Sequence, residues 1–210
     1  MPLEIITLQL GPMDNNSYLA ADPLTGEAVA IDPSFESQVI LETIDQHGWE
    51  LVAVWLTHAH FDHITGVKTL IQAAKKPLPV GLHPADLPIW RQGGGARLFG
   101  MQIEPGPEPT LRFRPNQILS LGSQTLEVRH TPGHTPGHVA FHSAESQAIF
   151  TGDLIFHHGV GRTDLPGGNH DQLLQSIRDH ILTLPPTTRL LSGHGPETTV
   201  QEELAENPFL

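Results

Sequence analysis

The sequence predicts an α/β protein folded as an αββα sandwich, in which two β-sheets pack face to face and helices cover their outer faces. Short apolar strands alternate with helical segments in both halves of the 210-residue chain. The chain also contains 20 Gly and 19 Pro, which is too many for a helical bundle and is typical of short elements joined by turns. This length suits one domain with a sizeable core, so we expect a single domain over residues 1–210.

The first half of the chain opens with strands and then alternates helix with strand. Apolar runs predict strands over Leu3 to Leu8, Ser17 to Ala21, Glu27 to Ile31 and Leu51 to Leu56. Apolar residues at helical spacing predict one helix from Phe35 to Ile44 and a second from Ile64 to Ala74. Ser34 is the expected cap of the first helix, and Gly48 lies just past its end.

The second half begins with a long loop and continues as a run of strands. Residues 93–116 are rich in Gly and Pro with scattered Arg, and loops of this length often shape the mouth of a substrate site. Strands are predicted over Ile118 to Leu121, Thr125 to Arg129, Val139 to Phe141 and Ala148 to Phe150. The last clear helix covers Leu173 to Ile181, and the last strand covers Arg189 to Leu191.

The composition excludes several kinds of function. The chain has no Cys, which removes thiolate catalysis, disulfides and iron–sulfur clusters, so any metal must be held by imidazole and carboxylate groups. Its formal charge of -12 disfavours a nucleic-acid partner. The N-terminal residues do not resemble a signal peptide and no run of 18 apolar residues occurs, so we expect a cytoplasmic protein without a membrane partner.

Four of the predicted strands end in short polar turns that carry His or Asp. The strand ending at Leu56 leads into His58-x-His60-x-Asp62-His63, and the other three lead into turns with His134, Asp153 and His194. Taken singly, Asp62 is most simply a helix cap, His63 a surface residue, and Asp153 and His194 ordinary turn residues. Together they indicate a metal centre, because rigid strand ends can hold ligands in a fixed geometry.

The spacing within the first of these turns indicates two adjacent metals. Alternation along an extended turn sends His58 and His60 to one side, whereas Asp62 and His63 begin a helix and point elsewhere.

These seven positions, in this order, resemble the signature of the metallo-β-lactamase-fold hydrolases. Within that superfamily the chain is most similar to the short, single-domain glyoxalase II group of hydroxyacylglutathione hydrolases. The stretches that support this are residues 130–138, 152–156, 159–164, 193–196 and 207–210. The resemblance implies that His58, His60 and His134 hold a first metal, that Asp62, His63 and His194 hold a second, and that Asp153 bridges them. It also implies an αββα sandwich of the metallo-β-lactamase type.

The same resemblance implies hydrolysis of an S-acylglutathione thioester by a metal-bound hydroxide, with Asp62 as the catalytic residue that orients the hydroxide and accepts its proton. Two divalent ions are expected, with zinc as the default and iron or manganese as alternatives. A thioester suits such a site because its thiolate departs without a dedicated acid. The only Tyr, Tyr18, is distant from the motifs in sequence, and we do not expect it to act as a proton donor to the leaving group.

The sequence differs from the full-length members of the glyoxalase II group in two respects. Full-length glyoxalase II enzymes continue into a helical domain that binds glutathione, and the resemblance predicts no such domain here. The segment after Asp153 contains Arg162 in place of the Lys and Tyr of the long enzymes. Arg162 is a candidate to bind the carboxylate of an anionic glutathione thioester, although an internal ion pair with Asp164 or Asp153 is the favoured interpretation.

Other functions stay open on the sequence alone. Residues 62–66 and 161–164 also resemble persulfide dioxygenases of the same fold, which would use a single iron held by His58, His134 and Asp153. The ending Gly193-His194-Gly195-Pro196 is more like that of the short hydrolases. Lactone or β-lactam hydrolysis and a non-catalytic metal-binding module are further alternatives, and the oligomeric state is not predicted.

The remaining histidines receive weaker predictions. His138 either supports a metal ligand or simply begins a strand. Surface or turn positions are expected for His130, His142, His157, His158, His170 and His180.

Overall fold

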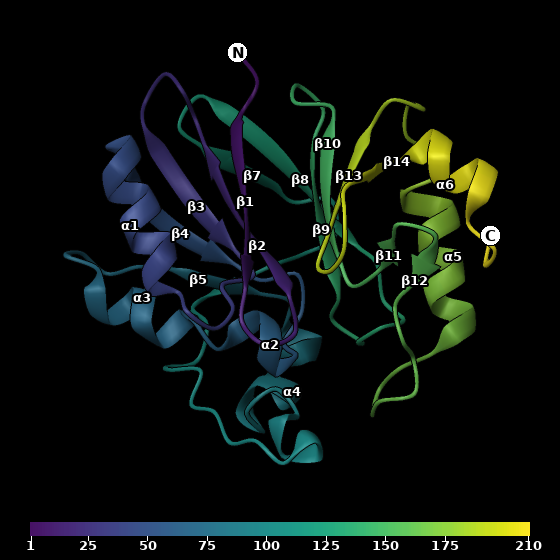
Figure 1. Cartoon of the computed structure of the whole chain (residues 1–210), viewed down its shortest axis with the longest axis horizontal. Helices are drawn as coiled ribbons and strands as arrows, with labels where there is room; N and C mark the ends of the chain where they lie inside the picture. Colours follow the sequence, from purple (N-terminus) through teal and green to yellow (C-terminus); the bar gives the residue numbers. More distant parts are fainter.

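The computed structural model describes residues 1–210 and confirms the αββα sandwich (Figure 1). The first sheet has six strands in the spatial order in which they follow the chain. They are β1 (Glu4–Leu10), β2 (Asn15–Ala21), β3 (Glu27–Ile31), β4 (Glu50–Trp55), β5 (Val80–Leu82) and β6 (Leu111–Arg112). Strands β1 to β3 are antiparallel, and β3 to β6 run parallel to one another.

The second sheet also has six strands, in the order β14-β13-β10-β9-β8-β7. They are β7 (Ile118–Leu121), β8 (Gln124–His130), β9 (Val139–Ser143), β10 (Ala148–Gly152), β13 (Arg189–Ser192) and β14 (Thr198–Thr199). Only β10 and β13 run parallel, and that pairing brings their carboxyl ends to the same edge. A separate hairpin consists of β11 (Ile155–Phe156) and β12 (Gly159–Val160).

Helices cover the outer faces of both sheets. The first sheet carries α1 (Gln38–His47) and α3 (Val67–Ala73), and α5 (His170–His180) and α6 (Val200–Glu206) lie beside the second (Figure 1). Shorter pieces are α2 (Phe61–Ile64), α4 (Leu87–Arg91) and the 3₁₀ turns η1 (Pro84–Asp86) and η2 (Ala96–Phe99). None of these helices is long and apolar enough to cross a membrane.

The alternation of side chains along the strands separates the core into layers. Val29 and Trp55 point inward and pack with Phe141 and Phe150 of the opposite sheet. These side chains belong to the apolar layer between the two sheets. The alternate residues of the first sheet, such as Ala30, pack against α1 and α3. A third cluster joins the outer face of the second sheet to α5. The core therefore holds both sheets in place, and the turns that follow the strands are anchored to these sheets.

Two details of the predicted helices were wrong. Ser34 does not cap the first helix, which begins at Gln38 with Ser37 as its N-terminal flanking residue. The chain cannot become helical earlier because Glu36 has a φ of 55° and the backbone N–H of Ser34 donates to the Ser17 hydroxyl at 3.0 Å. The expected position of Gly48 is confirmed, since it ends α1 in the left-handed conformation.

The helix predicted from Ile64 to Ala74 is instead two helices, α2 and α3, separated at Thr65 and Gly66. Gly66 packs so closely on the turn that precedes α1 that a Cβ atom there would collide with the backbone oxygens of Pro33 and Ser34. The backbone N–H of Gly66 also donates to the Pro33 oxygen at 2.9 Å. This tertiary contact, rather than helix propensity, sets the break.

Candidate metal centre

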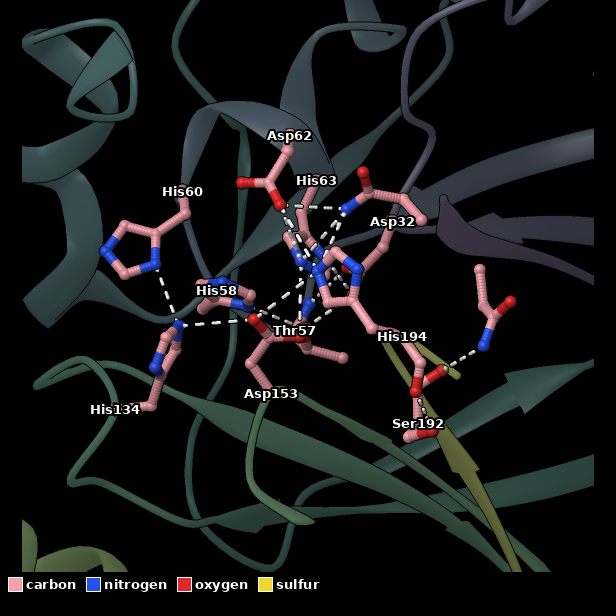
Figure 2. Close-up of polar contacts among 12 residues, drawn as sticks. Asp32, Thr57, His58, His60, Asp62, His63, His134, Asp153, Ser192 and His194 are labelled. Atoms are coloured by element: carbon pink, nitrogen blue, oxygen red, sulfur yellow. Dashed lines mark hydrogen bonds and ion pairs between the residues drawn. The ribbon is translucent and has the colours of Figure 1, made fainter. Parts of the chain in front are cut away.

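The structure brings all seven predicted residues to one end of the sandwich, where β4, β8, β10 and β13 lead into polar turns (Figure 2). The parallel pairing of β10 with β13 places Gly152 opposite Ser192, so that Asp153 and His194 follow from neighbouring strands. His134 follows β8 of the same sheet, and the turn after β4 of the other sheet supplies His58, His60, Asp62 and His63. The centre therefore lies where the ends of the two sheets meet.

His58, His60 and His134 form a first triad, whose ligand atoms lie within 4.8 Å of one another. All three side chains are buried, and the His60 Nδ1 atom lies 2.8 Å from the His134 Nε2 atom. Burial is the main cause that lowers the pKa of each imidazole, and neighbouring imidazoles add to it, so that the pKa of His60 is about 3; at His134 the Asp153 carboxylate partly opposes the shift. The triad is therefore a set of neutral imidazoles, which is the form that binds metals.

Asp62, His63 and His194 form a second triad. The Asp62 Oδ2 atom lies 3.5 Å from the His63 Nε2 atom and 3.4 Å from the His194 Nε2 atom. Asp153 lies between the two triads, with its carboxylate oxygens 3.3 Å from His63 Nε2 and 3.6 Å from His134 Nε2 (Figure 2). The structure thus brings together the residues that the resemblance assigns to two metal sites, although Asp32, His58 and His63 form a further, overlapping group of ligand atoms.

The second triad differs from the first in its charge. Burial alone would raise the pKa of Asp62, but His63 and the hydrogen bond with His194 outweigh it and hold this pKa at about 2. The pKa of His63 is raised well above its ordinary value, because Asp153 and Asp62 more than offset the effect of burial. In the absence of a cation, protonated imidazoles therefore balance the carboxylates, and a cation would take the place of those protons.

The donor set fits a divalent cation. The ion pairs of Lys and Arg side chains are 2.6 to 3.0 Å long, whereas the His–Asp contacts of the centre are 3.3 to 3.7 Å. Ligand atoms around a tetrahedral zinc with bonds of about 2.0–2.1 Å are themselves about 3.3–3.4 Å apart. The Nε2 atom of His58 is also buried without a hydrogen-bond partner, which is costly unless a cation binds it.

Asp32 was not predicted as a site residue, although it orients His63. It follows β3, which pairs in parallel with β4, so its carboxylate reaches the turn after β4. It receives hydrogen bonds from the Thr57 backbone N–H at 2.7 Å and from the Thr57 hydroxyl, and it lies 3.0 Å from His63 Nδ1. The contact directs the opposite nitrogen of His63 toward the centre. The only sequence signal was a polar residue at a strand end.

Asn15 was also missed. Its side-chain Nδ2 donates to Asp62 Oδ2 at 2.9 Å and lies 3.4 Å from both His63 Nε2 and His194 Nε2. It comes from the start of β2, and no spacing pattern links it to the other residues of the centre.

Asp86 is a third residue that sequence reasoning missed. Its buried carboxylate accepts hydrogen bonds from the Ala59 N–H at 3.0 Å, the Thr135 hydroxyl at 2.8 Å and the Gly137 N–H at 2.6 Å. Burial raises its pKa to about 6 even though these hydrogen bonds oppose the rise. One carboxylate thus holds together the two turns that carry His58, His60 and His134.

His138 and Tyr18 have supporting positions. The ring of His138 is fully buried, stacks on His58 with 5.3 Å between ring centroids, and places its Nδ1 atom 2.8 Å from the Thr131 hydroxyl. It therefore packs against a member of the first triad and immediately precedes β9. The Tyr18 hydroxyl donates to the Ser192 backbone oxygen at 2.6 Å and belongs to the core, so it is not placed to act as an acid.

A cavity of about 750 Å³ opens above the centre. Residues of both triads form its floor, and residues 93–99 of the predicted long loop form part of its wall, with Leu98 and Phe99 as large apolar contributors. Arg162 also lines the cavity, but its guanidinium forms two hydrogen bonds with Asp164 at 2.7 and 2.8 Å. The internal ion pair with Asp164 is therefore present, and Asp153 is not its partner.

Comparison with known proteins identifies relatives along nearly the whole chain. The model of the metallo-beta-lactamase superfamily matches residues 10–194. The chain is 38% identical over 207 residues to the probable metallo-hydrolase YqgX of Bacillus subtilis, covering 97% of this chain and 95% of that protein. It is 34% identical over 198 residues to the hydroxyacylglutathione hydrolase GloC of Haemophilus influenzae, covering 87% of each.

Solved structures show the same similarity. The crystal structure of BLEG-1 B3 metallo-beta-lactamase has a TM-score of 0.92, with 36% identity and 99% of each chain covered. TTHA1623 in a di-iron-bound form has a TM-score of 0.89 and 41% identity, covering 98% of this chain and 100% of that one. ETHE1 from Myxococcus xanthus has a TM-score of 0.81 and 27% identity, covering 98% of this chain and 83% of that one. The chain therefore belongs to the metallo-beta-lactamase superfamily.

Proposed function

We propose that the protein is a metal-dependent hydrolase that cleaves S-acylglutathione thioesters at a binuclear centre. The observation that carries the proposal is the pair of triads joined by Asp153 on the floor of a cavity. The similarity to the hydroxyacylglutathione hydrolase GloC supports the choice of substrate class.

In this proposal His58, His60 and His134 hold one divalent ion, Asp62, His63 and His194 hold the other, and Asp153 contacts both. Imidazole and carboxylate donors suit zinc, and they also suit iron and manganese. The di-iron form of TTHA1623 supports iron as the first alternative to zinc. Ions held there would lower the pKa of a water molecule and polarise the carbonyl group of a substrate.

Asp62 is the proposed catalytic residue. With its pKa near 2 it is ionised at neutral pH, and it lines the cavity. Asn15 donates to one carboxylate oxygen, Oδ2, and thereby fixes the orientation of the group. The other oxygen, which receives no hydrogen bond from the protein, is available to orient the attacking water and accept its proton.

The cavity suits a thioester because the leaving group needs no acid. Neither Tyr nor Lys lines it, so the residues around the centre offer no obvious proton donor for an amide nitrogen. A thiolate with a pKa of about 8.5 departs readily without one. Arg91, Arg97 and Arg162 line the same cavity and would favour an anionic substrate such as a glutathione thioester.

The test is hydrolysis of S-lactoylglutathione by zinc-reconstituted protein, followed by the release of free thiol. Asp62→Ala should lower kcat/KM by roughly a thousandfold, which corresponds to about 4 kcal/mol of transition-state stabilisation. Asp171→Ala, at an exposed position of α5, is the matched control and should retain wild-type activity. Absence of thiol release by the metal-loaded wild-type protein, or full activity of Asp62→Ala, would contradict the proposal.

A second candidate function is persulfide oxidation at a single iron held by His58, His134 and Asp153. The 3.6 Å separation of His134 Nε2 from Asp153 Oδ2 is compatible with ligands of one ion. This function predicts oxygen uptake when glutathione persulfide is added to the iron-loaded protein.

Hydrolysis of a β-lactam is a third candidate function, supported by the similarity to BLEG-1 B3 metallo-beta-lactamase. It should be tested by adding a β-lactam to the same protein preparation.

A further inference from the structure

A second cluster of metal-binding side chains lies outside the centre, at the tip of the β11–β12 hairpin. His157 and His158 form the turn of this hairpin, and Glu202 and Glu206 face them from α6. The ligand atoms of His157, His158 and Glu202 lie within 4.8 Å of one another. All the other groups of this kind in the protein belong to the centre described above.

The two imidazoles are stacked, and both direct their Nε2 atoms at the same carboxylate. Their ring centroids are 3.8 Å apart, with 23° between the ring planes. The Glu202 Oε1 atom lies 3.3 Å from His157 Nε2 and 4.0 Å from His158 Nε2, and Glu206 Oε2 lies 3.3 Å from His158 Nε2. Two imidazoles and two carboxylates from two elements thus lie together, and the rings would rotate out of their stack to point both Nε2 lone pairs at one ion.

Two of the three separations fit a ligand sphere around one ion, and the His157–Glu202 contact also meets the geometry of a long hydrogen bond. A charge-assisted N–H···O bond is about 2.7–2.9 Å long, and the exposed pair of Arg189 with Glu197 is at 2.6 Å. The 3.3 Å contacts at the hairpin equal the spacing of about 3.3–3.4 Å between ligands of a tetrahedral zinc. The Nε2 atom of His158 is shielded from solvent and has no hydrogen-bond partner, so it is free to bind a cation.

The cluster is held in place by buried hydrogen bonds. The fully buried carboxylate of Glu203 accepts from the His158 backbone N–H at 3.0 Å and from Asn207 Nδ2 at 2.7 Å. Asn207 Nδ2 also donates to the Gly159 oxygen at 3.0 Å. The hairpin turn is therefore attached to α6 before any ion arrives, and a preorganised set of ligands binds at a lower entropic cost.

We propose that His157, His158, Glu202 and Glu206 form a structural zinc site that joins the β11–β12 hairpin to α6. Two imidazoles and two carboxylates supply four ligands, which completes a tetrahedral shell without an open position for catalysis. The side chains of the two histidines are each about one-third exposed, so the cluster lies at the protein surface.

The site would also stiffen one wall of the cavity. Phe156 and Val160 flank the hairpin turn and line the cavity, and the Phe156 ring lies 6.0 Å from the ring of His194. Zinc at the turn would restrict the motion of these two residues without contacting a substrate.

The test is the number of zinc ions bound per chain in equilibrium dialysis, with zinc alone as the probe. His157→Asn/His158→Asn should bind one zinc fewer than the wild-type protein, and Glu202→Gln should bind the same ion more weakly. Asn is tolerated at residue 158, whose φ is 56°, so the variant is expected to fold. The matched control is His47→Asn/His170→Asn, which removes two exposed imidazoles that have no carboxylate partner, and it should bind as many ions as the wild type.

A second readout is hydrogen exchange over residues 155–160, which zinc should slow in the wild-type protein but not in the hairpin variant. Equal zinc content in the wild type and in both hairpin variants would overturn the proposal, as would loss of the same ion from the control. Because the result is a difference between variants, it does not depend on how many ions the catalytic centre holds or on which substrate it takes.

Discussion

At the scale of single residues, the centre depends on side chains that orient the triads. Asp32 directs His63, Asn15 fixes Asp62, and Asp86 joins the two turns of the first triad. These three were not evident in the sequence because Asp and Asn at strand ends and turns are common. Their roles depend on partners that are distant in the chain.

Asp86→Asn tests the joining role. An amide has one oxygen to accept hydrogen bonds, and its NH₂ group would face an N–H donor, so at least one of the three donors to Asp86 loses its partner. We expect a loss of about 1–3 kcal/mol in the free energy of unfolding, measured with urea, together with weaker zinc binding. Asp45→Asn, at an exposed position of α1, should change neither. Unaltered stability and zinc affinity in Asp86→Asn would show that this carboxylate does not position the triad.

At the scale of elements, the long and strongly periodic ones were predicted within a few residues, as for α1, β4, β8 and α5. The short ones were not, because β5, β6 and β14 have only two or three residues and offer no period to detect. The break between α2 and α3 has a tertiary cause, namely the close packing of Gly66 on the turn before α1.

The loop that begins at Gly93 packs directly on α2, the element that carries Asp62 and His63. Gly94 has a φ of 64°, its backbone oxygen accepts from the Phe61 N–H at 3.0 Å, and a Cβ atom there would collide with the Phe61 backbone. Gly94→Ala should therefore cost about 1–2 kcal/mol of backbone strain and should also displace α2, which lowers hydrolytic activity.

Gly100→Ala is the matched control for this prediction. Gly100 has a φ of 72°, but nothing lies within 4 Å of the added atom, so only the strain applies. Thermal unfolding and thiol-release assays of both variants separate the two effects. Equal losses of stability and activity in the two variants would show that the contact with α2 does not matter.

At the scale of the whole molecule, metal binding should couple stability to pH. In the metal-free protein the pKa of His63 is raised well above its ordinary value by Asp153 and Asp62. The pKa of His194 is raised as well, because the Asp62 hydrogen bond and Asp153 outweigh burial. These protonated imidazoles stabilise the metal-free fold below their ordinary pKa, and that contribution is lost as pH rises through the raised values.

A cation must displace those protons, so zinc should stabilise the protein less at pH 6 than at pH 8. Each proton released weakens binding about tenfold per pH unit below its pKa, or about 1.4 kcal/mol. Over two pH units this amounts to about 2.8 kcal/mol for one displaced proton, so the zinc-induced rise in Tm should be smaller at pH 6 by roughly 6–11 °C. In Asp62→Ala the difference between the two pH values should shrink. An equal rise in Tm at both pH values in the wild-type protein would contradict the expectation.

The sequence by itself determined the αββα class, because local spacing shows the order of strands and helices. It also indicated a metal centre, because His and Asp follow the ends of several strands. The charge and the lack of Cys further limited the kind of site. Only the tertiary structure decided which residues support the triads, where the loop from Gly93 lies and which partner Arg162 takes. Those features depend on contacts between residues that are far apart in the sequence, such as Asn15 and His194. Such contacts result from strand pairing and from the packing of the layers, and a local sequence pattern does not predict them.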